Sequence, residues 1–321
     1  MVDKLKSIGF YTLEDARAAR CSCVSPLWRC ELLVTSRCNF RCPYCRKRGA
    51  PDLTREEAIS ILNEWFMGDL QNVRISGGEP TLWPYLTEMV GLCKDAGVKH
   101  IAISTNGSAD FELYLGLLKA GVNDFSISLD ACCADTGELM MGHAKGVSWD
   151  NVVSNIRKLS LLTYVTVGVV ITEANLSETE DIIKFAHDLG VDDIRLVPAA
   201  QESRFLPHLN VGEDILEAHP VLKYRITNIL AERSIRGILE EDNHRCPLVL
   251  DDMAVESGKH YPCIIHLRER GEPIGKVGPM MREERANWFQ NHDCFADPIC
   301  NKNCLDVCVD YNNRVTELNK L

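Results

Sequence analysis

The chain has 321 residues, enough for one large α/β domain or for a large domain and a small one, and its 45% hydrophobic and 25% charged residues are typical of a soluble globular protein. The formal net charge of -11 argues against a broad nucleic-acid-binding surface, because such binding depends on Lys and Arg contacts to phosphates. No apolar run approaches the ~20 residues that span a bilayer, and the first residues lack the apolar core of a signal peptide, so we expect a cytoplasmic protein without membrane contact.

Residues 1 to 29 are interpreted as an N-terminal extension packed on the main domain, since they contain no strong strand pattern. The chain has 15 cysteines, and in a reducing compartment so many thiols indicate metal binding and not disulfides. Cys21, Cys23 and Cys30 lie within or next to this extension. Lone intracellular cysteines are usually small buried hydrophobic residues, so a structural role is favoured over metal ligation for these three.

From residue 30 to residue 205, short apolar runs alternate with helical patterns, which is typical of repeated βα units and a parallel sheet. Thr54 precedes Glu57 by three residues ahead of an apolar segment, and this capping box predicts a helix. The other predicted helices are 85 to 96, 110 to 120, 149 to 161 and 178 to 189. The predicted strands are 30 to 35, 72 to 76, 100 to 104, 124 to 128, 163 to 171 and 193 to 198. These units predict a partial (β/α)6 barrel of the TIM type, with the ligand site at the carboxyl ends of the strands.

Three cysteines, Cys38, Cys42 and Cys45, follow the first predicted strand in the spacing C-x3-C-x2-C. Thiolate sulfur suits zinc and iron-sulfur clusters, and this spacing lets three side chains converge on one centre. A structural zinc site needs four ligands, and no fourth ligand is nearby in the sequence. The trio therefore favours a cubane cluster with one open iron over the alternatives, a zinc loop or a redox-sensing thiol cluster.

Polar residues follow the second predicted strand, where Gly77 and Gly78 would let backbone groups approach a ligand and Glu79 supplies a carboxylate suited to an ammonium group. Asp130 ends the fourth strand, and for it a turn-capping role is an open alternative to ligand binding. Arg195 on the sixth strand either faces the barrel and binds an acidic group or forms a surface ion pair.

The cysteine spacing, Tyr44 before the third cysteine and the later Ser76-Gly77-Gly78-Glu79-Pro80 together resemble the radical S-adenosylmethionine (SAM) superfamily. The resemblance implies a 4Fe-4S cluster on Cys38, Cys42 and Cys45, and SAM chelating the fourth iron. One electron, from a partner such as flavodoxin or ferredoxin, would cleave SAM to a 5′-deoxyadenosyl radical that abstracts hydrogen from a substrate. The SAM contacts that it implies are Tyr44, Gly77, Gly78, Glu79, Ser104, Asn106, Ser128 and Asp130.

Past residue 205 the βα pattern stops, and a helical segment is predicted around 212 to 234. A hairpin pattern with Gly258 at its turn then brings Cys246 and Cys263 together. This arrangement resembles the opening of the SPASM/twitch extension of some radical SAM enzymes. The remaining late cysteines are Cys294, Cys300, Cys304 and Cys308.

The fuller SPASM pattern is only partly matched, because Asn291 stands where its first late cysteine should be. Two all-cysteine clusters need eight thiolates and only six are present from residue 246 onward, so we expect one auxiliary 4Fe-4S cluster in a small C-terminal domain. Its predicted ligands are Cys246 and Cys263 with two of Cys300, Cys304 and Cys308. A zinc site built from the same residues is the alternative.

The predicted organisation is an extension at 1 to 29, a radical SAM barrel at 30 to 205, and a linker helix with a twitch-like domain at 206 to 321. The predicted function is hydrogen abstraction from an unidentified peptide, small molecule, nucleotide or DNA base. The alternative is a regulatory iron-sulfur protein without catalysis, which would not need the Gly77-Gly78-Glu79 turn. Cys132 and Cys133 at the predicted barrel mouth are candidates for donating hydrogen to a substrate radical, although buried structural cysteines are commoner.

Overall fold

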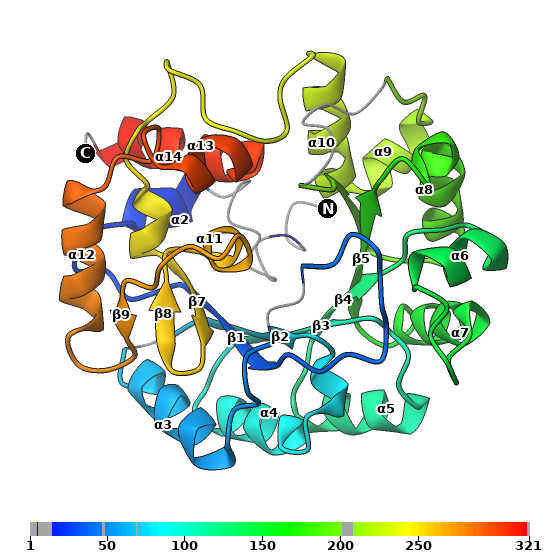
Figure 1. Ribbon diagram of the computed structural model, residues 1–321, viewed down its shortest axis with the longest axis horizontal. Helices are drawn as coiled ribbons and strands as arrows, with labels where there is room; N and C mark the ends of the chain where they lie inside the picture. The colour runs from blue at the N-terminus through cyan, green and yellow to red at the C-terminus, as the bar shows by residue number, and fades with distance from the viewer. Residues whose placement is uncertain (1–4, 6–14, 47–48, 69, 201–207, 320–321) are drawn as a thin grey trace.

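The computed structural model describes residues 5, 15–46, 49–68, 70–200 and 208–319. They form a nine-stranded sheet in the order β6-β5-β4-β3-β2-β1-β7-β8-β9. Neighbours from β6 to β7 are parallel, and β8 and β9 are antiparallel additions at one edge. Figure 1 shows the sheet curving into an open barrel with helices around its outer side.

The six predicted barrel strands are confirmed, with bounds within one residue of those predicted. They are β1 Arg29–Thr35, β2 Asn72–Gly77, β3 His100–Thr105, β4 Asp124–Ser128, β5 Tyr164–Ile171 and β6 Asp193–Pro198. The predicted helices that cover them are also present, and Thr54 and Glu57 form the expected capping box. These helices are α3 Arg55–Phe66, α4 Leu86–Asp95, α5 Phe111–Ala120, α7 Trp149–Leu159 and α8 Thr179–Asp188. The partial (β/α)6 barrel is therefore confirmed.

Three shorter elements in the barrel segment of the chain were not predicted. They are α6 Ala134–Met140 and the 3-10 helices η2 Pro80–Leu82 and η3 Leu176–Glu178. The helical segment predicted around 212 to 234 is present but divided. It forms α9 Glu213–Ala218 and α10 Pro220–Leu230, because the proline at the start of α10 has no backbone N–H and ends the preceding helix.

The C-terminal strands extend the barrel sheet, because β7 Asp252–Glu256 pairs in parallel with β1. The predicted hairpin is present but shorter than expected. It consists of β7 and β8 Lys259–Tyr261, and the preceding residues form the 3-10 helix η4 Pro247–Leu250. The other elements of this region are α11 Ile264–Arg268, β9 Gly275–Lys276, α12 Met281–Asn291, α13 Pro298–Asn303 and α14 Asp306–Asn319.

The helix α2 Asp15–Arg20 lies beside α14 (Figure 1), where Asn319 Nδ2 donates a 2.9 Å hydrogen bond to the Ala18 carbonyl. Arg236 joins the C-terminal region to the barrel, because its guanidinium donates to the carbonyls of Pro198 at the end of β6 and Asn303 in α13. No helix among the described residues is long and apolar enough to cross a membrane.

Alternate residues of the barrel strands face two different environments. One set is apolar and packs under the helices, as Leu32, Ile75 and Val167 do. The other set points into the barrel and is polar, as Arg74 and Ser126 do, both of which line an internal cavity. Polar groups inside a barrel are costly unless they pair or bind a ligand, so the barrel interior is a candidate binding site.

Candidate functional site

The three thiols of the C-x3-C-x2-C loop lie together after β1. The Cys45 amide donates a 3.1 Å hydrogen bond to the Cys42 carbonyl, so these two cysteines are joined by a turn. Cys38 and Cys45 are exposed and Cys42 is half-buried. The Cys42 thiol is close enough to Cys38 and Cys45 for their charges to raise its pKa, after the larger effects of burial and of Asp130. A cation bound by the three thiolates would offset that cost.

Gly77 and Gly78 allow the turn after β2 to dock against this loop. A Cβ on Gly77 would lie 2.3 Å from the Thr35 carbonyl oxygen, and one on Gly78 would lie 2.3 Å from that of Arg37. The Gly78 amide donates to Thr35 at 2.7 Å and the Glu79 amide donates to Arg37 at 2.8 Å. In the described structure the close approach inferred from these glycines is therefore made by the chain's own backbone.

The Glu79 carboxylate is buried and joins two strand ends. Its Oε1 atom accepts hydrogen bonds from the Thr81 and Thr105 hydroxyls, each at 2.7 Å, and its Oε2 atom accepts one from the Asn106 amide at 2.7 Å. Burial raises the pKa of Glu79, and these donors partly reverse the shift by stabilising the charged form. Glu79 thus braces the site in addition to the ligand-binding role predicted for it.

Asn106 connects the end of β3 to the cysteine loop. Its Nδ2 atom donates to Asn39 Oδ1 at 2.8 Å and lies 3.9 Å from Cys38 Sγ. Its Oδ1 atom accepts from the Ser108 amide at 3.0 Å. The Asn106 side chain therefore helps to position Cys38, the first cysteine of the loop.

Asp130 connects the same loop to β5. Its Oδ2 atom accepts a hydrogen bond from the Tyr44 hydroxyl, and its Oδ1 atom accepts one from the Val170 amide at 2.7 Å. The Asn175 side chain donates to the Asp130 carbonyl at 2.9 Å. In these contacts Asp130 links the cysteine loop to β5, a role that was not predicted, and the SAM contact implied for it stays a prediction.

The other residues predicted near SAM occupy different positions. Ser128 is exposed at the end of β4. Ser104 is the next-to-last residue of β3, and its hydroxyl accepts a 3.3 Å hydrogen bond from Arg74 inside the barrel. Cys132 lies 3.8 Å from Glu178 Oε2 and Cys133 lies 3.6 Å from the Thr136 hydroxyl, so these described contacts are made toward α6 and η3.

Arginines and carboxylates lie inside the barrel in the amino-terminal halves of its strands. Arg74 donates to Asp124 at 3.3 Å, and Arg195 lies 3.5 Å from the Ser126 hydroxyl. The Nε atoms of both arginines are buried and have no hydrogen-bond partner among the described residues. Burial, followed by repulsion from Arg74, lowers the pKa of Arg195 to about 10, so it stays charged at neutral pH.

A cavity of about 140 Å³ opens from these arginines toward the C-terminal region. Arg74 and Arg195 line it on the barrel side, and Cys263 and Cys308 line it on the other. It therefore lies on the unclosed side of the barrel, between the sheet and the late cysteines. Its charged lining residues are Arg29, Arg74, Arg195, Arg225, Glu31 and Asp252.

The six late cysteines form one continuous group. The Cys304 thiol hydrogen bonds to Cys308 and interacts electrostatically with Cys246 and Cys263. The Cys294 thiol hydrogen bonds to both Cys246 and Cys300. All six are free thiols. The structure thus brings together the five predicted ligands and adds Cys294, which the sequence-based ligand set omits.

Residues 32–186 match the model of the Radical SAM superfamily. GTP 3′,8-cyclase of Crocosphaera subtropica is 30% identical to the chain, and the match covers 67% of this chain and 69% of that protein. The chain belongs to the radical SAM superfamily. Another member, a probable GTP 3′,8-cyclase of Sulfurisphaera tokodaii, is 27% identical over 71% of each chain.

Radical SAM structures also share the fold. SuiB of Streptococcus suis superposes with a TM-score of 0.59 at 16% identity, covering 86% of this chain and 67% of that one. Native anSMEcpe with bound AdoMet gives a TM-score of 0.58 at 14% identity, covering 92% and 95%. The family assignment confirms the predicted radical SAM chemistry, in which a 4Fe-4S cluster and SAM are the cofactors.

Several polar residues of the site were not predicted from the sequence. Arg74 and Asp124 are separated by 50 positions and meet only because their strands lie near one another in the sheet. His292 and Asp297 flank Cys294 in the sequence, and this proximity was the available signal for their part in the cysteine region.

Proposed function

We propose that this radical SAM enzyme acts on an anionic substrate, a nucleotide, whose phosphates bind the arginines of the barrel cavity. The observation that carries the proposal is the half-buried pair Arg74 and Arg195, whose buried Nε atoms have no hydrogen-bond partner among the described residues. The cavity lining holds four arginines and two carboxylates, in a chain whose formal net charge is -11. Three of these arginines form ion pairs, Arg29 with Asp252, Arg74 with Asp124 and Arg225 with Asp306, whereas Arg195 forms none among the described residues. Arg195 is therefore the guanidinium best placed to bind a phosphate, which accepts hydrogen bonds from Arg in pairs.

The relatives support a nucleotide over a peptide. Those reported above are named as GTP 3′,8-cyclases, whereas the solved neighbours that hold a bound peptide share only the fold. A cavity of about 140 Å³ accommodates part of a nucleotide. We place the phosphates there, and the sugar or base that would lose a hydrogen atom toward the cysteine loop.

In this proposal Cys38, Cys42 and Cys45 hold the cluster, which supplies the electron for reductive cleavage of SAM. The chain's donor set fits that cluster, since three converging thiols leave one position for SAM. Asn106 and Tyr44 hold the loop in place through Asn39 and Asp130. Glu79 keeps the ends of β2 and β3 together, and we assign the SAM ammonium to the turn Gly77-Gly78-Glu79. The reductant is a small electron carrier such as flavodoxin or ferredoxin.

We further propose that Cys246, Cys263, Cys304 and Cys308 hold one auxiliary 4Fe-4S cluster. Their mutual electrostatic contacts, and the positions of Cys263 and Cys308 on the cavity wall, support this set. An auxiliary cluster there would border the substrate.

The test combines binding with turnover. Reconstituted protein is titrated anaerobically with GTP, ATP and CTP by calorimetry, and 5′-deoxyadenosine is measured with dithionite and SAM. We expect nucleotide binding that is lost in Arg195→Ala and Arg74→Ala while SAM binding persists. Arg55→Ala, which removes an exposed arginine paired with Glu88, is the matched control. If none of the nucleotides binds, or if the three variants behave alike, the proposed substrate class is wrong.

A further inference from the structure

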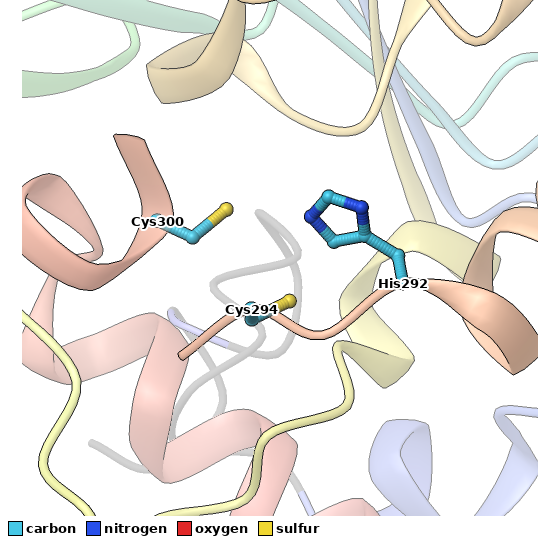
Figure 2. Close-up of side chains that lie close together, drawn as sticks. All are labelled: His292, Cys294 and Cys300. Carbon is cyan, nitrogen blue, oxygen red and sulfur yellow. The ribbon is translucent and has the colours of Figure 1, made fainter. Parts of the chain in front are cut away.

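Two imidazoles and a carboxylate lie against the edge of the late cysteine group. The ligand atoms of His292, Cys294 and Cys300 all lie within 4.8 Å of one another, and so do those of His266, Asp297 and Cys300. In Figure 2 the Cys300 sulfur and the His292 ring point toward each other, and the Cys294 sulfur lies beside them. His292 and Cys294 come from the segment between α12 and α13, whereas Cys300 is on α13.

Ring nitrogens in this group are buried without a hydrogen bond. Among the described residues, His292 Nε2 and His266 Nδ1 have no hydrogen-bond partner, although His292 Nε2 lies 3.1 Å from Asp297 Oδ2 in an ion-pair contact. The His266 side chain is only 7% exposed. His266 Nδ1 faces Gly271, where a Cβ would lie 2.2 Å from it. A buried polar nitrogen without a hydrogen bond is costly, so His292 Nε2, beside the thiols, indicates a missing ligand.

The surroundings hold both rings in fixed positions. The His292 ring stacks on Trp288 with centroids 4.0 Å apart. The His266 ring packs where a Cβ on Gly271 would lie 2.1 Å from it, so only glycine leaves that space. Asp297 caps α13 by accepting from the Ile299 and Cys300 amides at 2.8 Å, which directs its Oδ2 atom toward the two histidines.

The six late thiols divide into two sets, the four proposed ligands of the auxiliary cluster and two others. Four of them, Cys246, Cys263, Cys304 and Cys308, complete the ligand set of one cubane. Cys294 and Cys300 remain, and they are the two that lie beside His292. Cys300 also lies near Cys263, so it stands at the border between the two sets.

We propose that His292, Cys294 and Cys300 bind a zinc ion, with the fourth position filled from the adjacent pair His266 and Asp297. Two thiolates, an imidazole and a further nitrogen or oxygen form the mixed, closed set that structural zinc sites use. Asp297 Oδ2 lies 3.1 Å from His292 Nε2 and 3.6 Å from His266 Nε2, which places both members of this pair beside the proposed ion. The ion replaces thiol protons with metal bonds, which relieves the crowding of Cys294 between two other thiols.

The zinc would join the elements that carry the auxiliary ligands. α11 begins directly after Cys263, and α13 runs from Pro298 to the residue before Cys304. With His266 as the fourth ligand, the ion would join α11 to α13 and so fix the positions of Cys263 and Cys304, two of the four proposed cluster ligands. This proposal does not depend on the identity of the substrate.

The experiment measures zinc and iron in the same full-length sample. Protein expressed with added zinc and reconstituted anaerobically with iron and sulfide is desalted and analysed by mass spectrometry for both metals. We expect about one zinc per chain, and in His292→Ala and Cys300→Ser a loss of most of that zinc with iron unchanged. Cobalt substituted for zinc should give the intense visible absorption of a tetrahedral thiolate site.

His244→Ala is the matched control, because this histidine lies in the same region, stacked on Phe295, outside the ligand group. It should retain zinc. If Cys300→Ser does not fold, the zinc content of His292→Ala alone tests the proposal, because that substitution removes an imidazole ring and leaves every thiol in place. Loss of about four irons from His292→Ala would overturn the proposal, because that residue would then belong to an iron-sulfur centre. Wild-type protein without zinc, or variants that keep it, would overturn it as well.

Discussion

The Oε2 atom of Glu79 accepts a 2.7 Å hydrogen bond from the backbone amide of Asn106, and so the turn after β2 is fastened to the turn after β3. The same carboxylate takes three further hydrogen bonds, from the Thr81 amide, the Thr81 hydroxyl and the Thr105 hydroxyl. A residue predicted to bind SAM thus also holds together the strand ends that form the site.

Glu79→Ala should therefore lower stability as well as SAM affinity. Removing the carboxylate leaves buried donors without an acceptor, at a cost of about 1–3 kcal/mol. Anaerobic urea unfolding measures the loss of stability, and calorimetry measures SAM binding. Glu79→Gln, which keeps an oxygen acceptor and removes the charge, separates the two roles: it should retain most of the stability and still bind SAM weakly. An alanine variant as stable as wild type would contradict the bracing role.

Gly78→Ala should disrupt the cysteine loop. Its Cβ would lie 2.3 Å from the Arg37 carbonyl oxygen, which is backbone and cannot move aside without shifting the loop. We expect lower iron incorporation at the primary cluster and a lower melting temperature. Gly116→Ala is the matched control, since it lies in α5 with nothing within 4 Å of the new Cβ, and it should stabilise the helix by up to ~1 kcal/mol.

Most of the barrel was predictable from the sequence, because each strand is a local apolar run and each helix has its own periodicity. Residues 164 to 171 are an example, in which alternate residues are buried. The late region was predicted poorly, since α12 has a charged first turn and little apolar periodicity, and its position depends on Arg285. This arginine is fully buried and donates to the carbonyls of Val249, Tyr261 and Asp252. Contacts between such distant residues leave no local pattern.

The site was also predictable only where its residues are neighbours in the sequence. The cysteine trio and Glu79 are recognisable because they are neighbours in the sequence. The role of Asp130 depends on its contact with Tyr44, which is 86 positions away, and no spacing rule could indicate that contact. The partly matched late cysteines gave the right group but not the histidines beside it.

Replacing Cys38, Cys42 and Cys45 together with alanine should abolish formation of 5′-deoxyadenosine, because the proposed cluster loses its protein ligands. The variant should still hold about four irons at the auxiliary centre. Cys133→Ser is the matched control: this thiol is exposed, its described contact is with Thr136, and we expect wild-type rates. Product formed by the triple variant would contradict the assignment of the primary cluster.

Asp193 should make stability depend on pH. Its buried carboxylate accepts hydrogen bonds from the Val221 and Leu222 amides at the start of α10. Burial raises the pKa of Asp193 to about 7, against its ordinary value of 3.8, and these hydrogen bonds only partly oppose the shift. The folded protein then binds more protons than the unfolded chain between those two values, so this residue's contribution to stability falls as pH rises through the window.

Asp193→Asn keeps an oxygen that can accept from α10 and cannot ionise. Its free energy of unfolding should therefore change less with pH than that of the wild type, with the two curves diverging as pH rises toward about 7 and becoming parallel above it. Anaerobic urea unfolding at several pH values on both proteins measures the difference, in which the titration of the groups common to both proteins largely cancels. Curves that stay parallel from about pH 5 to 8 would show that Asp193 is already ionised in the folded protein at the lower end of this range, and that the α10 amides stabilise its charge more than burial opposes it.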